Sequence, residues 1–304
     1  MKQELFPEIA DSGLRIDKYL SSVNEQLSRS YIQKLLKSGL VLVDGKPVKA
    51  SYQVDEGDVI SLDIPEAVEP EIEPEDMDLD ILYEDQDVIL VNKPKGMVVH
   101  PAAGHYSHTL VNGLMYHCKD QLSGINGVMR PGIVHRIDMD TTGVIIACKN
   151  DISHNSIAAQ LKEHSITRRY QAIVHGVLKD DDGTIEGPIG RHPTDRKKMS
   201  INYNNGKSAV THYKVLKRFR QYTHVECRLE TGRTHQIRVH MASIGHPLLG
   251  DLVYGPGKCP IPGLQGQTLH AGVLGFIHPR TGEYMEFTAP LPEYFAKLLN
   301  TLPE

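Results

Sequence analysis

The sequence predicts an α+β protein whose main domain contains a mixed, largely antiparallel sheet and is preceded by a small helix-hairpin domain. Two observations support this prediction. An acidic, proline-containing segment at 65–80 divides the chain. Beyond it, most strand-like segments are joined by short turns, whereas a doubly wound parallel sheet needs a helical crossover between neighbouring strands. The predicted divisions are therefore 12–64, a linker over 65–80, and 81–304.

The N-terminal domain carries the signals of two helices followed by a hairpin. Residues 15–20 and 30–37 have apolar side chains at helical spacing, and 40–43 has the composition of a strand. The signals that bound these elements are, in chain order, Ser28 as an N-cap, Gly39 as a left-handed C-terminal cap and Asp44-Gly45 as a two-residue hairpin turn.

This N-terminal domain is also basic. Residues 12–50 contain seven lysines and arginines against three acidic residues, an excess suited to phosphate groups. Taken alone, the same pattern fits a small domain with a solvated charged face equally well. The candidate RNA-binding residues are Arg15, Arg29, Lys34, Lys37 and Lys46.

In the main domain, strands and helices follow one another without an internal repeat. The predicted strands are 87–92, 143–148, 170–175 and 224–230. The predicted helices are 109–115, 151–162 with Asp151 as its cap, and 234–244; a hairpin-like turn is expected at 180–183.

The net charge of −5 hides an uneven distribution. Fifteen acidic residues lie between Asp55 and Asp87, a segment without lysine or arginine. Removing these 15 from the 38 acidic residues leaves 23, against 33 basic ones in the remaining chain. Basic surface outside the acidic segment favours a polyanionic partner such as RNA, while the segment itself fits a solvated linker.

Composition argues against several other classes of protein. No apolar stretch approaches the roughly 20 residues that span a bilayer, and the first residues lack the pattern of a secretory signal. We therefore expect a cytoplasmic protein without a membrane partner. Four scattered cysteines argue against a disulfide framework or a zinc ribbon. We expect no metal, no cofactor and no obligate protein partner, and hence a monomer.

Polar residues gather in the loop just before the buried strand at 143–148. The run His135-Arg136-Ile137-Asp138 is followed by Asp140 and two threonines. Catalytic side chains concentrate in such loops, which a rigid scaffold holds in place. For an isolated aspartate, however, capping of backbone amides in a turn is the better interpretation.

Two further clusters carry cations and aromatic rings. Arg233, His235, Arg238 and His240 lie within eight residues at the start of a predicted helix, an arrangement suited to an anion or a carboxylate. Thr167-Arg168-Arg169-Tyr170 opens a predicted strand, and adjoining aromatic and guanidinium groups can stack on an unpaired base. Alone, these clusters also fit a solvated basic face and a tyrosine at a strand edge.

Together these motifs resemble the RluA-type pseudouridine synthases. The shared elements are Lys93-Pro94-x-Gly96-x-x-x-His100, His135-Arg-Ile-Asp-x-x-Thr-Thr-Gly143, Arg168-Arg-Tyr170, Gly232-Arg-Thr-His-Gln-Ile-Arg-Val-His240 and Gly245-His-Pro-Leu-Leu-Gly-Asp251. The likeness runs from about residue 12 to the C-terminus. The basic N-terminal domain resembles the module named after ribosomal protein S-four, which is usual in the RluD-like branch. Ile137 and Thr142 stand where leucine and serine are most common in the family, and both replacements preserve size and polarity.

The resemblance implies a role for each matching residue. It implies that Asp138, and not Asp140, is the catalytic carboxylate and that Tyr170 stacks on the target base. Arg238 would pair with the aspartate, and Arg136 would take the place of the uridine that leaves the RNA. With these, His135 and Arg233 complete the predicted substrate-binding set. The implied fold is that of the pseudouridine synthases.

The implied reaction breaks the N1–C1′ bond of uridine, rotates the uracil and rejoins it through C5. The base must leave its stack to reach a pocket. No redox step, cofactor or metal is needed. Three roles of Asp138 are compatible with this chemistry: attack on C1′, addition to the uracil ring and removal of the 2′ proton.

Other functions share part of the pattern. The predicted substrate is large-subunit ribosomal RNA, with a tRNA-acting synthase or a non-catalytic ribosome assembly factor as alternatives. The 16 histidines suggest a metallohydrolase, but no His-Glu-x-x-His run or compact ligand set accompanies them. A glycosidase needs two cooperating carboxylates, and Asp138 and Asp140 are only two residues apart.

Overall fold

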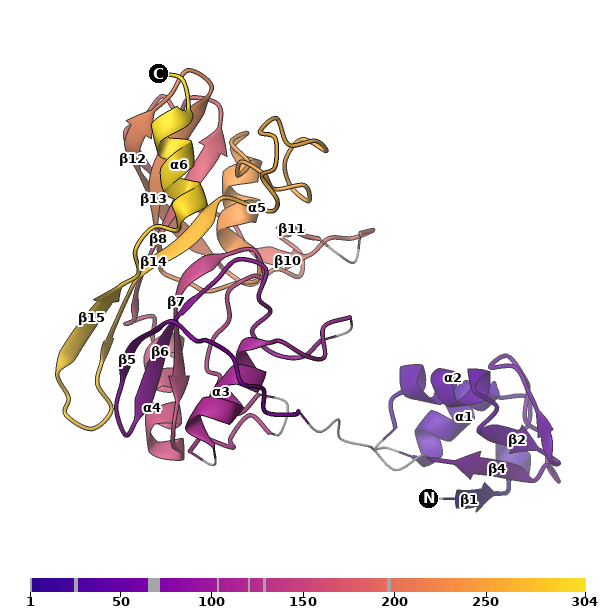
Figure 1. Cartoon of the computed structure of the whole chain (residues 1–304). Helices are drawn as coiled ribbons and strands as arrows, with labels where there is room; N and C mark the ends of the chain where they lie inside the picture. Colours follow the sequence, from indigo (N-terminus) through magenta and orange to yellow (C-terminus); the bar gives the residue numbers. More distant parts are fainter. Residues whose placement is uncertain are drawn as a thin grey trace. The chain divides into compact units, whose positions relative to one another are not determined.

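The computed structural model divides into two compact units, Met1–Glu69 and Pro70–Glu304 (Figure 1). The residues that the structure describes are 2–24, 27–64, 72–102, 104–119, 121–127, 130–195 and 198–304. Residues 65–71 of the predicted linker lie outside this set.

The N-terminal unit packs α-helices against a small antiparallel sheet. Its elements in the described residues are β1 (Lys2–Leu5), the 3-10 helix η1 (Ile9–Asp11), α1 (Ile16–Val23), α2 (Arg29–Lys37), β2 (Val41–Val43), β3 (Lys46–Pro47) and β4 (Ile60–Asp63). The strand order is β1-β4-β2-β3, and each pair is antiparallel. Apolar side chains of α1, α2, β2 and β4 form one core.

The local signals of this unit act as the sequence predicts. The Ser28 hydroxyl accepts a hydrogen bond from the backbone N–H of Tyr31 at the start of α2, and Gly39 follows the helix with a φ of 71°. Asp44 and Gly45 have φ values of 50° and 72°, as a two-residue hairpin of type I′ requires. The two predicted helices and the hairpin are confirmed.

The second unit is larger and mixes strands with helices. Its strands in the described residues are β5 (Ile81–Glu84), β6 (Val88–Lys93), β7 (Thr142–Cys148), β8 (Thr167–His175), β9 (Asp182–Glu186), β10 (Ile189–Arg191), β11 (Met199–Ile201), β12 (Val210–Arg218), β13 (Tyr222–Leu229), β14 (Leu269–Ile277) and β15 (Tyr284–Thr288). Its helices are α3 (Leu110–Cys118), α4 (Asp151–Lys162), α5 (Gln236–Ser243) and α6 (Glu293–Thr301).

Nine of these strands form one sheet. Its order is β5-β6-β7-β14-β8-β13-β12-β9, with β15 beside β14, while β10 and β11 form a separate hairpin. Among the paired strands of the described residues, only β7 and β14 run parallel. The predicted mixed, largely antiparallel sheet is therefore confirmed.

Helices cover both faces of the sheet around β7, which is buried along its whole length. Ile145 on one face packs in a core with apolar residues of α3 and α5. Ile146 on the other face packs in a core that includes Ile157 of α4. Because successive side chains of a strand point to opposite faces, the unbroken apolar run of β7 serves two cores.

The strand order brings the predicted site segments together. The loop that contains Asp138 runs directly into β7, and only β14 lies between β7 and β8, which carries Tyr170. Helix α5, which carries Arg238, follows β13, and β13 pairs with β8. Segments up to 100 residues apart therefore converge near the middle of the sheet, where β7, β14 and β8 lie side by side (Figure 1).

Three predicted boundaries are wrong. The cap of α4 is Asn150, whose side chain accepts from the N–H of Ser153, so Asp151 is the first helical residue. Asp182 and Gly183, expected in a turn, belong to β9 and pair with β12. Helix α5 begins after His235, because that residue adopts a left-handed conformation with a φ of 57°.

The acidic segment also differs from the prediction, since residues 72–80 pack on the second unit. Ile72 is 6% exposed. The N–H of Glu75 donates to the carbonyl of Asn112 (3.0 Å), and the Glu75 carboxylate accepts from the N–H of His108 (3.0 Å). Composition alone hides these contacts, because the three apolar residues of this segment, Ile72, Met77 and Leu79, are scattered among charges and a proline.

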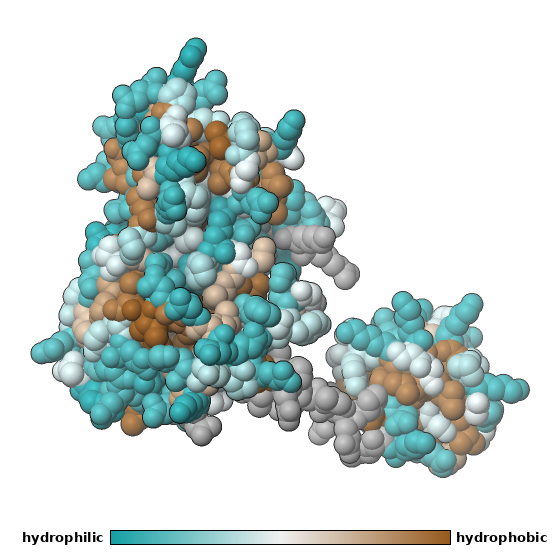
Figure 2. All heavy atoms as spheres, viewed as in Figure 1, coloured by the Kyte–Doolittle hydropathy of each residue, from teal (hydrophilic) through white to brown (hydrophobic). Residues whose placement is uncertain are grey.

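The described helices are too short or too polar for any of them to cross a membrane. Figure 2 shows hydrophilic residues over most of the visible surface of both units, with hydrophobic residues between them. Single exposed apolar side chains are ordinary on protein surfaces.

Candidate active site

Asp138 lies in a loop that buried contacts hold in place. Ile137, directly before it, is 8% exposed, and the N–H of Thr141 donates to the backbone carbonyl of Asp138 (3.0 Å). Burial lowers the pKa of His135 to about 3, so its ring is neutral. Its Nε2 accepts the N–H of Ile146 in β7 (3.1 Å). His135, predicted to bind substrate, thus anchors the loop while lining the cavity described below.

A buried lysine supports the other side of this loop. Lys93 is fully buried, and its Nζ donates to the carbonyls of Pro94 (2.8 Å), Met97 (2.8 Å) and Met139 (2.9 Å). Burial lowers the pKa of Lys93 to about 7. The three carbonyls match the three N–H bonds of an ammonium group. Lys93 therefore links Met139, the residue after Asp138, to the turn that follows β6.

The carboxylate of Asp138 is paired with a buried arginine. Nη1 of Arg238 lies 2.9 Å from Oδ2 of Asp138. The same guanidinium binds Asp251 through Nε (2.6 Å) and Nη2 (3.0 Å). Side-chain exposure is 24% for Asp138, 7% for Arg238 and 0% for Asp251. Asp251 therefore fixes the arginine, and the arginine holds Asp138.

Charge pairing outweighs burial in setting the pKa values of Arg238 and Asp251. Burial alone would lower the pKa of Arg238, but Asp251 and Asp138 raise it above its usual value. Burial would raise the pKa of Asp251, but Arg238 lowers it below the usual range. The arginine is therefore positively charged across the physiological range, and this charge lies directly against the Asp138 carboxylate.

A histidine lies against the other oxygen of Asp138. Nε2 of His235 is 3.7 Å from Oδ1, and Nδ1 is 2.8 Å from the hydroxyl of Tyr254. That hydroxyl accepts the N–H of Met199 (2.8 Å), so its own proton is free to donate to Nδ1. Burial lowers the pKa of His235, with Asp138 opposing it. A neutral ring that accepts from Tyr254 at Nδ1 would carry its proton on Nε2, which faces the carboxylate.

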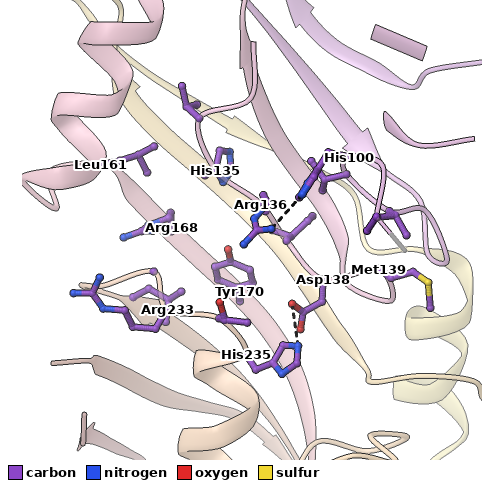
Figure 3. A pocket seen from close by; sticks show the side chains of 18 of the residues that line it. His100, His135, Arg136, Asp138, Met139, Leu161, Arg168, Tyr170, Arg233 and His235 are labelled. Carbon is purple, nitrogen blue, oxygen red and sulfur yellow. Dashed lines mark hydrogen bonds and ion pairs between the residues drawn. The ribbon is translucent and has the colours of Figure 1, made fainter. Parts of the chain in front are cut away.

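Asp138 opens into a cavity of about 680 Å³ that Tyr170 also lines. Tyr170 is 9% exposed, and Figure 3 shows its ring next to Asp138. A smaller pocket of about 60 Å³ shares both residues. Its apolar lining residues are Ile137, Leu229, Ile237 and Leu269. A planar ring that enters this pocket can lie on Tyr170 with one edge towards a carboxylate.

The remaining predicted substrate-binding residues line the larger cavity. Arg136 is exposed, and its Nη1 lies 3.4 Å from Nε2 of His100. Burial, with the nearby arginines adding to it, lowers the pKa of His100 to about 4, so the neutral ring can accept from Arg136. Nε of Arg233 donates to the carbonyl of Ser208 (3.0 Å), which leaves the rest of the guanidinium at the cavity.

The predicted RNA-binding residues of the N-terminal unit fall into two groups. Arg15 and Arg29 pair with Asp17, at 3.1 Å and 2.9 Å, and the side chain of Asp17 is fully buried. These two arginines therefore stabilise the packing of α1 and α2. The lysines are exposed and form no ion pair with any residue in the described ranges; they are Lys34, Lys37 and Lys46.

Sequence reasoning missed several residues of the site. Asp251 ends a motif that carried the family resemblance, but its spacing gave no indication that it holds Arg238. In the sequence, His235 is recognisable only as part of a basic cluster and Lys93 only as part of a family motif, while nothing local marks Tyr254. Each works through contacts between segments, which periodicity does not report.

Models of two protein families match the chain. The model described as RNA pseudouridylate synthase covers residues 87–243. The model of the S4 domain covers residues 14–60. The first range contains the loop of Asp138, strand β8 and helix α5, and the second contains α1, α2 and the β2–β3 hairpin.

Known proteins resemble the chain over almost its whole length. An uncharacterised RNA pseudouridine synthase of Bacillus subtilis (strain 168), YlyB, is 58% identical over 95% of this chain and 94% of the relative. Ribosomal large subunit pseudouridine synthase D of Zymomonas mobilis is 47% identical over 95% and 94%. The structure of human RNA pseudouridylate synthase domain containing 1 is similar with a TM-score of 0.58 and 25% identity, over 75% of this chain and 96% of that one.

Proposed function

The chain belongs to the family of RNA pseudouridylate synthases, and we propose that it acts on large-subunit ribosomal RNA with Asp138 as its catalytic carboxylate. As a pseudouridine synthase it is an isomerase that converts uridine to pseudouridine in RNA, and its main domain has the fold of this family. A relative 47% identical along nearly the whole chain, named for the large ribosomal subunit, supports the proposed substrate.

One observation carries the proposal for the site. Asp138 is the carboxylate that is both partly exposed in the cavity and paired with a buried arginine, beside an aromatic ring. We propose that the target base leaves its stack and lies on Tyr170 in the small pocket. Arg238 pairs with the Asp138 carboxylate there and holds it in position. Attack on C1′, addition to the ring and removal of the 2′ proton all need such an anion beside the nucleotide.

The substrate is tested by mapping pseudouridine. Purified protein is incubated with transcripts of large-subunit rRNA and with tRNA, and rRNA from a strain lacking the gene is mapped in parallel. We expect new pseudouridines in the rRNA transcript and their loss from the deletion strain. Modification of tRNA alone would show that the protein is a tRNA-acting synthase. Binding of rRNA without conversion of uridine would favour a ribosome assembly factor.

We expect replacement of Tyr170 to separate the ring from its hydroxyl. Tyr170→Phe keeps a flat ring for stacking and should lose little activity. Tyr170→Ala removes the stacking surface and should lower kcat/KM by roughly 10- to 100-fold, since stacking contributes about 1–3 kcal/mol per base. The measurement is the rate of conversion of an rRNA hairpin, with thermal melting as the control for folding. Equal losses in both variants would contradict a stacking role.

We propose that the exposed lysines Lys34, Lys37 and Lys46 contact RNA phosphates. Replacing all three with glutamine should weaken RNA binding and lower the slope of log Kd against log salt by about 2–3, because each phosphate contact releases counterions. Lys18→Gln/Lys49→Gln provides the control, since both side chains are exposed on the same unit. A slope that stays constant in the triple variant would place the RNA elsewhere.

We also propose that the protein works as a monomer in the cytoplasm, without an obligate protein partner. Asp138, Tyr170, Arg238 and His235 all come from one chain and meet around one cavity. Light scattering of the active protein at working concentration tests this. A dimer that loses activity on dilution would contradict it.

A further inference from the structure

Arg168 is a buried arginine that the proposed chemistry does not use. It is 6% exposed and lies two residues before Tyr170 on β8, so both side chains point to the same face of the strand. Both line the 680 Å³ cavity. Figure 3 shows Tyr170 with Asp138 on one side and Arg168 on the other. The spacing along the strand is roughly 6–7 Å.

The charge of Arg168 is not balanced by any carboxylate in the described part of the chain. No carboxylate among the described residues forms an ion pair with it, and its buried Nε has no hydrogen-bond partner there. Nη2 makes one long hydrogen bond, to the carbonyl of Glu230 (3.3 Å). Burial, together with the nearby Arg233, lowers the pKa of this guanidinium. Buried charges are normally paired, so Arg168 has the properties of an anion-binding residue.

The surrounding chain makes room for this guanidinium. Gly232 lies so close to Nη1 of Arg168 that a Cβ atom at this position would collide with it. The segment Gly232–His235 lines the cavity next to it. A glycine in this place lets the arginine lie against the backbone instead of being displaced towards solvent.

The cavity as a whole favours an anion. Its lining contains four permanent cations and one carboxylate, and that carboxylate is already paired with Arg238. The cations are Arg136, Lys162, Arg168 and Arg233. Arg168 lines this larger cavity but not the small pocket proposed for the base. It therefore faces a part of the ligand that stays outside that pocket.

We propose that Arg168 binds a phosphate group of the RNA strand adjoining the target nucleotide. The proposal rests on the proposed function and assigns a phosphate site to the same cavity. A guanidinium offers a planar set of donors that matches phosphate oxygens, and the phosphate supplies the charge that the protein lacks. Binding would hold the extruded nucleotide so that its base lies on Tyr170 and its glycosidic bond faces Asp138.

Arg168→Met tests the proposal in a way that separates binding from stability. Methionine keeps a flexible, linear side chain without the charge. Because an unbalanced buried charge is removed, the melting temperature should stay constant or rise, whereas RNA binding should weaken. Arg169→Met is the matched control: this neighbour points to the opposite face of β8 and pairs with Glu286 (2.7 Å). It should leave RNA affinity unchanged.

The phosphate itself is identified by neutralising single linkages in the RNA. The RNA is a hairpin from whichever cellular RNA the purified wild-type protein converts. A methylphosphonate replaces the linkage 5′ or 3′ of the target uridine, with 2′-O-methyl on the sugar before it. The reference RNA has the same sugar and an ordinary phosphate. At one linkage the wild-type Kd should rise roughly tenfold or more, whereas the Arg168→Met variant should lose less than about twofold.

A second variant tests the geometry independently. Gly232→Ala should push Arg168 out of position, because the atom in the way is the end of a flexible side chain. It should reduce the same methylphosphonate effect without unfolding the protein. The proposal is overturned if both linkages weaken binding equally in wild type and Arg168→Met, or if Arg168→Met lowers stability and leaves affinity intact. If the converted RNA is not ribosomal, the substrate proposal fails while this test proceeds unchanged.

Discussion

Asp138→Asn is expected to abolish uridine isomerisation, with a loss of about 10⁴-fold or more, as for other essential catalytic carboxylates. Asparagine has nearly the same size but carries no charge, so it cannot serve as nucleophile or base. Folding should persist, because Arg238 keeps its two bonds to Asp251 and can still donate to the amide oxygen of Asn. RNA binding should persist as well.

The measurement is pseudouridine formation on an rRNA hairpin, with melting temperature and RNA affinity measured on the same preparation. Asp140→Asn is the matched control, two residues away in the same loop, and should keep most of the activity. Normal turnover by Asp138→Asn would contradict the role of Asp138 as the catalytic carboxylate. Equal loss in both variants would mean that charge in the loop as a whole, and not the carboxylate of Asp138, is required.

Arg238→Met is expected to cost both stability and activity. Asp251 has a fully buried side chain, and this variant would leave it there without its cation. Breaking a buried ion pair in this way typically costs about 3–5 kcal/mol. Activity should fall as well, because Asp138 loses the ion-pair partner that positions its carboxylate. Urea denaturation and conversion of an rRNA hairpin measure the two effects.

The double variant Arg238→Met/Asp251→Asn separates the effect on stability from the effect on activity. The asparagine oxygen can still accept the N–H groups of Val253 and Tyr254, as Oδ1 of Asp251 does (2.9 Å and 3.2 Å). Without a buried charge, the double variant should recover at least half of the lost stability, while activity stays low. If activity returned together with stability, Arg238 would be only a structural residue.

The pH dependence of stability has a definite sign. In the wild type, Arg238 lowers the pKa of Asp251 although burial would raise it. The ionised Asp251 therefore stabilises the fold above the usual aspartate pKa range, and this stabilisation is lost as pH falls through the pKa of Asp251 in the folded protein. In Arg238→Met, burial is opposed only by the backbone N–H groups of Val253 and Tyr254, so the pKa of Asp251 should be higher than in the wild type. The difference in unfolding free energy between the two proteins should therefore shrink as pH falls from 7 towards about 4.

Local signals account for what could be predicted of the fold. Three features depend on neighbouring residues only and were predicted from the sequence: the cap at Ser28, the positive φ of Gly39 and the Asp44-Gly45 hairpin. The apolar run of β7 was readable for the same reason. The cap of α4 was misplaced by one residue, because Asn150 and Asp151 are both good caps and only the backbone conformation separates them.

Contacts between distant segments account for what could not be predicted. Asp17 reads as a solvated residue of a helix, yet it is buried because Arg15, Arg29 and Gln33 converge on it. Residues 72–80 read as linker, yet hydrogen bonds to α3 attach them to the second unit. Periodicity reports the face of an element and contains nothing about the element that this face meets.

The sequence by itself determined the chemistry that this protein can offer: a carboxylate at Asp138, an aromatic ring at Tyr170, cations at 136, 168, 233 and 238, and a basic domain in front. Only the tertiary structure decided how these groups are paired. It gives Arg238 two carboxylates and, among the described residues, gives Arg168 none, and it turns His235 towards Asp138 through Tyr254. The physical reason is that charge and hydrogen-bonding capacity belong to a residue, whereas pairing and burial depend on segments that the fold brings together across the sheet.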